Sequence, residues 1–202
     1  MTSTHILPHL PPHKIHITHL PSLPLRAFQT FQTELTSSTS PSSASSEYTF
    51  LDASTILSAT HLLAAIFQAT RNELVSGKRR TRNVHSEVVY CLGGNNNIKE
   101  AYKKFGVTEE TKDVIAVKIA YGSGEYWCER EEVEGNIRRV IGEEGVMEVY
   151  NDEVAKRVVD VDKVRKYYKI KAGGSLTKGI DALGISALEV EVLGKMVGRV
   201  VG

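Results

Sequence analysis

Residues 87–106 read EVVYCLGGNNNIKEAYKKFG. The opening run, residues 87–92, is compact and apolar, which predicts a buried strand. Glycines and asparagines follow and indicate a turn. Apolar residues then recur at the i, i+3, i+4 and i+7 spacing of an amphipathic helix over residues 98–105, and Gly106 is expected to end this helix in the left-handed conformation. A strand, a turn and a helix in this order indicate a domain that packs helices against a sheet.

Strands and helices are predicted on both sides of this segment. Further strands are expected at residues 14–20, 48–51, 114–121 and 146–150, with the histidines of the first on its wetter face. Helices are expected at about 25–35, from 56 to near Gly77, at 129–141 with an interruption at Gly135, in one or two short stretches within 151–168, and at about 186–201. The fold class is therefore α/β (α+β).

The length of the chain fits one domain. Its 202 residues compare with ~150 in a typical domain, so the whole of 1–202 is predicted to be a single domain. All six prolines lie in the first 41 residues, and all 16 glycines lie from Gly77 onward. The serine-rich run at 37–47 cannot bury apolar surface and is predicted to be a flexible loop within the domain. Residues 173–175, Gly-Gly-Ser, are predicted to be a hinge.

Composition excludes several classes of protein. The chain has 25 lysines and arginines against 24 aspartates and glutamates, so its net charge of +1 indicates neither a polyanion-binding chain nor an acidic tail. Cys91 and Cys128 form no paired framework, which fits a reducing compartment. A run of about 18 apolar residues is missing, and residues 1–10 lack the basic and apolar regions of a signal peptide. We therefore expect neither a membrane-bound nor a secreted protein.

The patterns that catalysis needs are missing from the sequence. The glycine-rich segment 173–179 lacks the residue order of a phosphate-binding loop, and Gly122-Ser123-Gly124 lacks the third glycine of a dinucleotide fingerprint. Prolines interrupt the N-terminal histidines, so these do not form a helical metal site. A nucleophile pair of Cys91 and His85 is disfavoured because the thiol is expected in an apolar strand. We expect no catalytic residue, metal or cofactor, and the alternative is a small nucleotide-binding protein or enzyme that uses the glycine-rich loops.

Two neighbouring segments could contact nucleic acid. Lys78, Arg79, Arg80 and Arg82 place four cations within five residues, either in a solvated loop or at a phosphate-binding site. The turn 93–97 places backbone N–H groups at a helix start, where an anion can bind. Its asparagines either read base edges or only tolerate left-handed turn geometry.

The last predicted helix has two apolar lines. One contains Leu188, Val192 and Met196. The other contains Val190, Leu193, Val197, Val200 and Val201. Together they exceed the usual apolar stripe of ~100°, which indicates either deep burial or one face on the core and the other on a partner. Gly194 and Gly198 weaken the helix, and their spacing also permits close approach of another surface.

Residues 80–87, RTRNVHSE, and 97–106, NIKEAYKKFG, resemble the central signature of the TPRKB-like subunit of the KEOPS (also EKC) complex. The resemblance extends more loosely to 50–52 and the helix after them, to RKYYKI at 165–170 and to the C-terminal apolar helix, and so covers most of the chain in order. The serine-rich loop, the proline-rich arm and the glycine-containing segments near 125–144 and 173–184 depart from compact relatives.

This resemblance implies a non-catalytic subunit with a mixed, mostly antiparallel sheet and helices packed around it. Members of the family bind an atypical kinase of the PRPK type, which contacts the threonylcarbamoyl transferase subunit. The assembly makes threonylcarbamoyladenosine in tRNA and is linked to telomere maintenance. In archaeal relatives the subunit recruits tRNA by its 3′ CCA end. A nuclear and cytoplasmic location, with a possible place at telomeres, is expected on the same ground.

Residues of this chain are assigned to two predicted partners. The kinase is expected to contact the last helix and the helix before Gly77, through Leu188, Val192, Leu193, Met196, Leu63 and Phe67. The tRNA is expected to contact the basic loop and the asparagine turn, through Arg80, Arg82, Asn95, Asn96, Asn97, Ile98 and Lys99.

Overall fold

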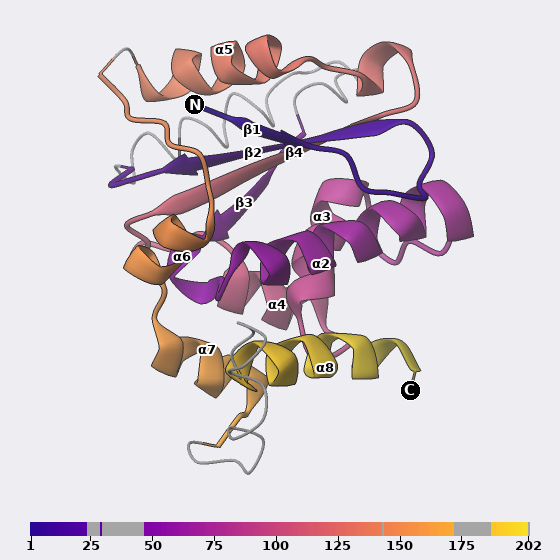
Figure 1. Ribbon diagram of the computed structural model, residues 1–202, viewed down its shortest axis with the longest axis vertical. Helices are drawn as coiled ribbons and strands as arrows, with labels where there is room; N and C mark the ends of the chain where they lie inside the picture. The colour runs from indigo at the N-terminus through magenta and orange to yellow at the C-terminus, as the bar shows by residue number, and fades with distance from the viewer. Residues whose placement is uncertain (24–28, 30–46, 143, 172–186, 202) are drawn as a thin grey trace.

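The computed structural model describes residues 1–23, 29, 47–142, 144–171 and 187–201 (Figure 1). The described strands form one sheet in the order β1-β2-β4-β3, and every pairing is antiparallel. The central pair, β2 (His13–Leu20) and β4 (Val114–Tyr121), is in register along its whole length. Short strands β1 (Ser3–His5) and β3 (Thr49–Asp52) form the edges. Strands predicted near 14–20, 48–51 and 114–121 are thus confirmed.

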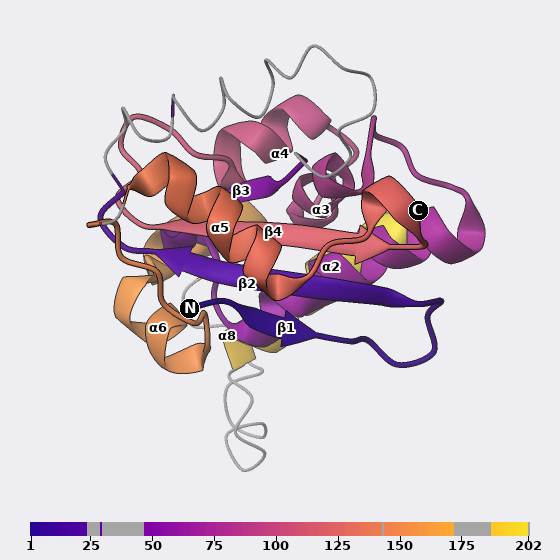
Figure 2. The ribbon, with the colours of Figure 1, turned by 90° about the horizontal axis from the view of Figure 1, so that it is seen from above.

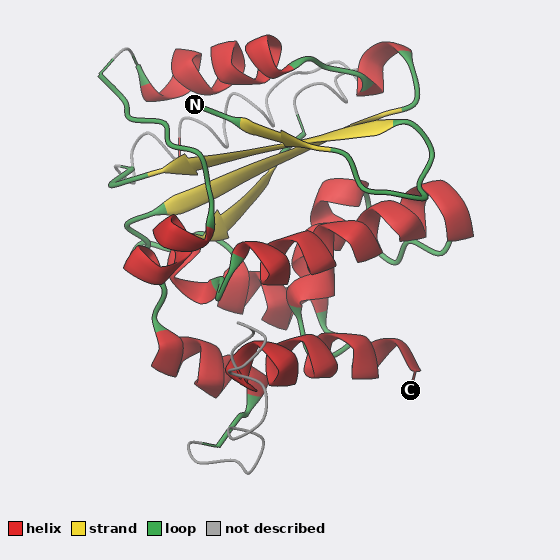
Figure 3. Cartoon of the chain, in the orientation of Figure 1, coloured by secondary structure: helices red, strands yellow, loops and turns green. Residues whose placement is uncertain are grey.

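Helices cover both faces of this sheet (Figures 1 and 3). On one side lies α5 (Arg130–Ile141), and we call the space between α5 and the sheet the upper layer. On the other side lie α2 (Ala59–Arg71), α3 (Val84–Leu92) and α4 (Ile98–Phe105), with α8 (Ala187–Val201) beyond them. We call this side the lower layer. Figure 2 shows the same layers from above.

Shorter elements connect these layers. A 3-10 turn, η2 (Ala53–Thr55), precedes α2, and a π-turn, η3 (Asn72–Ser76), follows it. A second 3-10 turn, η4 (Gly124–Tyr126), precedes α5, and α6 (Asp152–Val158) and α7 (Val161–Tyr168) lead toward α8. None of the described helices is long and apolar enough to span a bilayer. The predicted α/β (α+β) class with helices around a sheet is confirmed.

The predicted strand at 87–92 is wrong, because these residues belong to helix α3. The Asn83 side chain caps the helix by accepting a hydrogen bond from the Ser86 N–H at 2.8 Å. Almost every residue of α3 is buried, so no polar face interrupts its apolar run. A short run that is buried on all sides shows no period that separates strand from helix. Burial from several directions therefore misled the prediction.

The histidines of β2 are not on a wet face. His16 and His19 are buried because α5 covers one face of the strand and the lower helices cover the other. His16 Nε2 donates to the Cys128 carbonyl at 3.2 Å, which leaves Nδ1 to accept from the Thr4 hydroxyl at 3.0 Å. The alternation of residues in β2 was correct, but it separates two buried faces.

Three further predictions are corrected. Gly106 is extended, with φ −73° and ψ 165°, and pairs with Leu51. A Cβ there would lie 2.6 Å from the Tyr102 carbonyl oxygen, so close approach explains this glycine. The predicted strand 146–150 is reduced to one bridge between Glu148 and His19, and Gly135 does not interrupt α5. The helix at 25–35, the serine-rich run up to residue 46 and the hinge at 173–175 lie outside the described residues, apart from Gln29.

Candidate binding surfaces

Helices α2 and α8 form one end of the lower layer. Ser58 caps α2 by accepting from the His61 N–H at 2.9 Å, and its hydroxyl also donates to the Glu189 carboxylate near the start of α8. The two helices are thus tied at their N-terminal ends and run side by side (Figure 1). The end of α8 is therefore carried along the exposed side of α2.

The first apolar line of α8 points into the protein. Val192 is 0% exposed and Met196 is 2% exposed, and both belong to the main core with Leu62 and Ile66 of α2. Leu188 is half-buried at the edge of that core. Of the two alternatives for this line, the structure shows deep burial. A partner cannot reach Val192 or Met196 without moving α8.

Both helices also carry accessible apolar side chains. Phe67 on α2 is 39% exposed and Val197 on α8 is 58% exposed. Leu63 and Leu193 are half-buried. Phe67 lies about 13 Å beyond Ser58 along α2, and Val197 lies about 12 Å beyond Glu189 along α8, so the two are at the same level. We call Leu63, Phe67, Leu193 and Val197 the α2–α8 surface.

Two glycines of α8 lie beside this surface, and no contact with the described residues requires glycine at either position. Gly194 and Gly198 on α8 are both exposed, and a Cβ added to either would meet nothing within 4 Å. A glycine inside a helix is less favourable than alanine by about 1 kcal/mol. The packing of the described residues therefore does not require them. Val197 belongs to the second apolar line but was not among the residues predicted to contact the kinase.

The basic loop is built around a buried carboxylate. Glu87 of α3 is fully buried and accepts hydrogen bonds from the backbone N–H groups of Arg80 and Thr81, each at 3.1 Å. It also accepts from the Thr81 hydroxyl at 2.9 Å and from the Asn72 amide at 3.0 Å. Arg79 is paired with Glu73. The remaining cations of the loop are exposed, namely Lys78, Arg80 and Arg82.

The asparagine turn is held together by its own side chains. Asn97 caps α4 by accepting from the N–H groups of Lys99 and Glu100, so these donors are already used. Asn95 accepts from the Asn97 N–H, and Asn96 accepts from the Tyr90 hydroxyl at 2.8 Å. None of the three has a positive φ, which rules out the left-handed explanation. The asparagines are there to build the turn, and the exposed atoms of Asn96, Asn97 and Lys99 remain accessible.

The two predicted RNA segments are not adjacent. The basic loop precedes α3 and the asparagine turn follows it, so the nine residues of α3 separate them by about 13 Å. One RNA strand must therefore pass along α3 or α4 to reach both. The half-buried Ile98 serves the core more than the surface.

The two side chains weighed as a nucleophile pair, Cys91 and His85, are both buried. Cys91 is buried in α3. His85 Nε2 accepts from the Ile119 N–H at 3.0 Å, and burial lowers the pKa of His85 to about 4. Within the described part of the chain, no three His, Cys, Asp or Glu side chains are grouped as metal ligands.

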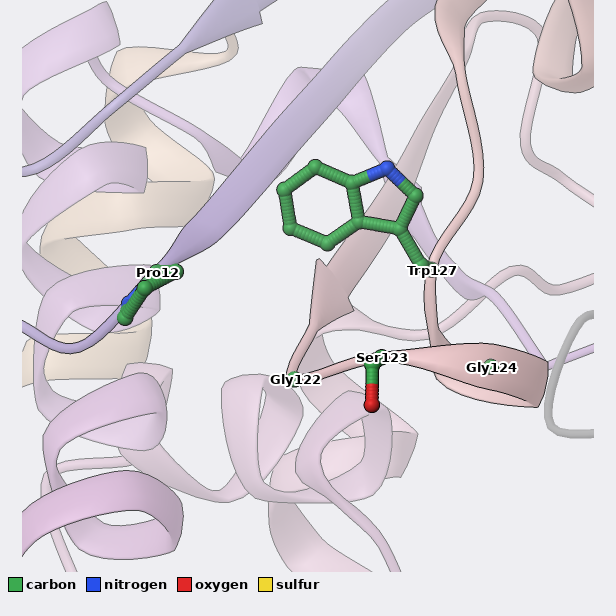
Figure 4. Close-up of a pocket in the computed structure, with 5 residues that line it drawn as sticks. All are labelled: Pro12, Gly122, Ser123, Gly124 and Trp127. Atoms are coloured by element: carbon green, nitrogen blue, oxygen red, sulfur yellow. The ribbon is translucent and has the colours of Figure 1, made fainter.

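A shallow hollow of about 400 Å³ lies beside the Gly122-Ser123-Gly124 loop (Figure 4). Pro12 and Trp127 complete its lining, which includes no charged side chain among the described residues. Lys14 lies over the Trp127 ring at 5.0 Å and is paired with Glu129 at 2.7 Å. The described lining thus offers a phosphate no free cation, and it gives the nucleotide-binding alternative no support. The other glycine-rich loop, 173–179, lies outside the described residues.

Comparisons with known proteins point to one family. Residues 28–199 match the family model described as "Kinase binding protein CGI-121". Proteins named EKC/KEOPS complex subunit CGI121 are 38% identical in Yarrowia lipolytica over 64% of this chain, and 41% identical in Neurospora crassa over 61% of it. The one in Aspergillus fumigatus is 36% identical over 64% of this chain. The matched segments span 68%, 63% and 65% of these relatives, respectively. The resemblance seen in residues 80–106 is confirmed, and the chain belongs to the CGI-121 family of kinase-binding proteins.

Proposed function

We propose that this protein is a non-catalytic subunit of a KEOPS/EKC-type complex and that it binds an atypical kinase through the α2–α8 surface. The main support for this proposal is the set of exposed apolar side chains on α2 and α8. Both helices pack on the same core, which holds them in place. Phe67 and Val197 are the accessible anchors, whereas the buried Val192 and Met196 support the helix beneath them. A standard interface of roughly 800 Å² per partner would extend from these anchors onto the neighbouring turn η3.

The exposed glycines sharpen this proposal. Without side chains, Gly194 and Gly198 leave a flat strip on α8 where the backbone of a partner can approach closely. Because this strip lies beside the apolar anchors, we assign it to the same interface. The fold alone would be more stable with alanine at both positions.

The test is co-purification of the kinase with single variants. Phe67→Asp or Val197→Asp should weaken kinase binding at least 30-fold, since a buried charge replaces an apolar anchor of about 2 kcal/mol or more. Val146→Asp is the matched control, because Val146 is 55% exposed and lies outside the α2–α8 surface. Native circular dichroism is required for each variant. Wild-type affinity in both anchor variants would place the interface elsewhere.

A second pair of variants separates binding from folding. Gly194→Ala and Gly198→Ala should each raise the free energy of unfolding by up to about 1 kcal/mol and yet weaken kinase binding. A variant that is more stable and binds less well cannot be explained by unfolding. Unchanged binding in both alanine variants would remove the glycine strip from the interface.

We also propose that the protein contacts tRNA near its 3′ CCA end and so supports threonylcarbamoyladenosine formation. The exposed cations of the basic loop and the exposed residues at the start of α4 support this second role. Family membership alone supports the further proposals of a role in telomere maintenance and of a nuclear and cytoplasmic location. The isolated protein should bind a tRNA transcript more weakly when CCA is removed. Equal binding of the two transcripts would contradict recognition of that end.

A further inference from the structure

Helix α7 packs directly against α4, although more than fifty residues separate them in the sequence. The Phe105 ring contacts the rings of Tyr167 and Tyr168 at 5.8 and 5.7 Å. Lys104 Nζ donates to the Tyr167 carbonyl at 3.4 Å and lies 5.9 Å from the centre of the Tyr167 ring. The two helices therefore form one packed unit.

Buried hydrogen bonds fix this arrangement. The Tyr168 hydroxyl donates to the Leu92 carbonyl at 2.6 Å, at the end of α3. His61 Nδ1 accepts from the Leu57 N–H at 3.1 Å, so its Nε2 carries the proton and donates to the Tyr168 hydroxyl at 2.8 Å. Burial lowers the pKa of His61 to about 3, so the ring stays neutral at physiological pH. Tyr168 thus holds α7 against the segment that leads into the asparagine turn.

Exposed lysines gather on the two helices. The described chain exposes Lys99 and Lys103 on α4 and, on and after α7, Lys166, Lys169 and Lys171. Glu100 is the acid between them, and hydrogen bonds from Lys104 and Asn95 hold its pKa below the usual value. The charge of Lys169 lowers that pKa further, which places Lys169 within electrostatic reach of α4. We call these five exposed lysines the lysine face. The acids of the two helices are Glu100, paired with Lys104, and Asp162, which lies beside Arg165.

Exposed acidic residues also lie on the opposite side of the sheet. Glu129, Glu131 and Glu132 are exposed at the start of α5, in the layer on the other face of the sheet (Figure 1). Because α5 also carries Arg130, Arg138 and Arg139, its excess of acid is small, and the attraction for anions rests on the exposed lysines alone.

An exposed aromatic ring borders the lysine face. Tyr102 on α4 is 44% exposed and flanks Lys99 and Lys103. Lysines that follow a backbone together with a ring on which a base can stack are the combination that binds single-stranded nucleic acid. A double helix would offer phosphates but no free base for Tyr102.

We propose that the RNA-binding face extends from the asparagine turn across α4 onto α7, where Lys166, Lys169 and Lys171 bind phosphates and Tyr102 stacks on a base of a single-stranded 3′ end. This inference rests on the proposed tRNA contact and adds α7 to it. Neither the basic loop nor the asparagine turn alone provides such a continuous surface.

The test measures binding of a tRNA transcript and of a short single-stranded RNA with the same 3′ end, at several salt concentrations. Lys166→Gln/Lys169→Gln should weaken both about tenfold and reduce the salt slope by about 1.4, because each lysine that neutralises a phosphate contributes about 0.7 to that slope. The matched control is Arg139→Gln/Lys156→Gln, which removes two exposed charges from α5 and α6 and should change binding less than twofold. Tyr102→Leu should weaken binding of the short RNA roughly tenfold, and Tyr102→Phe should restore it.

The possible failures are distinguishable. If the wild-type protein binds neither RNA, the proposed tRNA contact fails and this inference fails with it. If Arg80→Gln/Arg82→Gln weakens binding but the α7 variant behaves like the control, the tRNA contact stands and α7 is not part of it. Equal competition by polyglutamate, together with an unaffected Tyr102→Leu variant, would overturn the inference in favour of an acidic protein surface.

Discussion

The upper and lower layers of the sheet are built differently. In the upper layer, the small apolar cluster of Val133, Ile137 and their neighbours shares the sheet surface with the buried polar residues His16, Thr18 and Lys118. The lower layer has a larger apolar core that runs from the sheet through α2, α3 and α4 to α8, and it encloses the buried polar residues His61, His85 and Glu87. Helix α5 also begins without a side-chain cap, whereas Ser58, Asn83 and Asn97 cap the lower helices.

The two layers therefore contribute differently to the protein. The lower layer stabilises the domain and also presents the α2–α8 surface and the lysine face, because its rigid core fixes the helices that carry them. The upper layer closes the second face of the sheet. The comparison can be tested layer by layer.

The largest effect is expected from truncating the lower core. Phe105→Ala should lower the free energy of unfolding by about 3–5 kcal/mol, because it leaves a cavity among rings that cannot collapse into it. Ile137→Ala, an equally buried change in the upper layer, should lower it by about 2 kcal/mol. Urea unfolding of both variants provides the measurement. Equal losses would show that the two layers share the stability evenly.

The next effect is a gain of stability in the upper layer. Lys118 is buried, its Nζ donates to the Glu47 carbonyl at 2.9 Å, and burial lowers its pKa to about 8. At pH 7 the folded protein holds Lys118 protonated and buried from water. A pKa lowered by this amount corresponds to a loss of about 3 kcal/mol in the free energy of unfolding. Lys118→Met removes that charge together with the hydrogen bond and the contact with the Tyr48 ring, so we expect a net gain of about 2 kcal/mol.

The pH dependence of this gain provides its control. Between pH 8 and 10.5 the unfolded chain still holds the Lys118 proton that the folded protein has released, so the wild type becomes more stable as pH rises. The advantage of Lys118→Met should therefore disappear near pH 10. A variant that is less stable than wild type at pH 7 would show that the polar contacts of Lys118 outweigh its burial.

The smallest effect concerns acid sensitivity in the lower layer. The folded-state pKa of His85, about 4, lies below the unfolded value of about 6.5. The contribution of neutral His85 to the stability of the fold is complete above pH 6.5. It is lost as pH falls toward 4, because the unfolded chain then takes up a proton that the folded protein excludes. His85→Gln keeps an acceptor for the Ile119 N–H without titrating. Between pH 7 and pH 5.5, the free energy of unfolding, measured by thermal unfolding, should fall by about 1 kcal/mol less in the variant than in the wild type. Equal losses would exclude His85 as the cause.

The helix at 98–105 and the strand at 114–121 were predicted correctly. The helix has one exposed face, and the strand, although buried on both faces, has a long β-branched run between turn residues. Residues 87–92 and the histidines of β2 were misjudged for a common reason. Both segments are enclosed on all sides, and enclosure removes the contrast between wet and dry faces on which a sequence pattern depends.

The candidate surfaces were only partly predictable. The two apolar lines of α8 were visible in the sequence, but their spacing could not show which one faces the core. The lysines of α7 were not predicted to form a binding site, because the sequence does not show that α7 packs beside α4. Asn83, in contrast, was a readable helix cap that could have identified α3.

By itself, the sequence determined the α/β class, the family through residues 80–106 and the presence of a two-sided apolar helix at the end of the chain. These properties depend on local spacing and on residue types, which the chain carries in order. The tertiary structure alone decided that Val192 and Met196 point inward, that Val197 and two glycines are exposed, and that α7 packs against α4. Each of these depends on contacts between segments that are distant in sequence, and only packing brings them together.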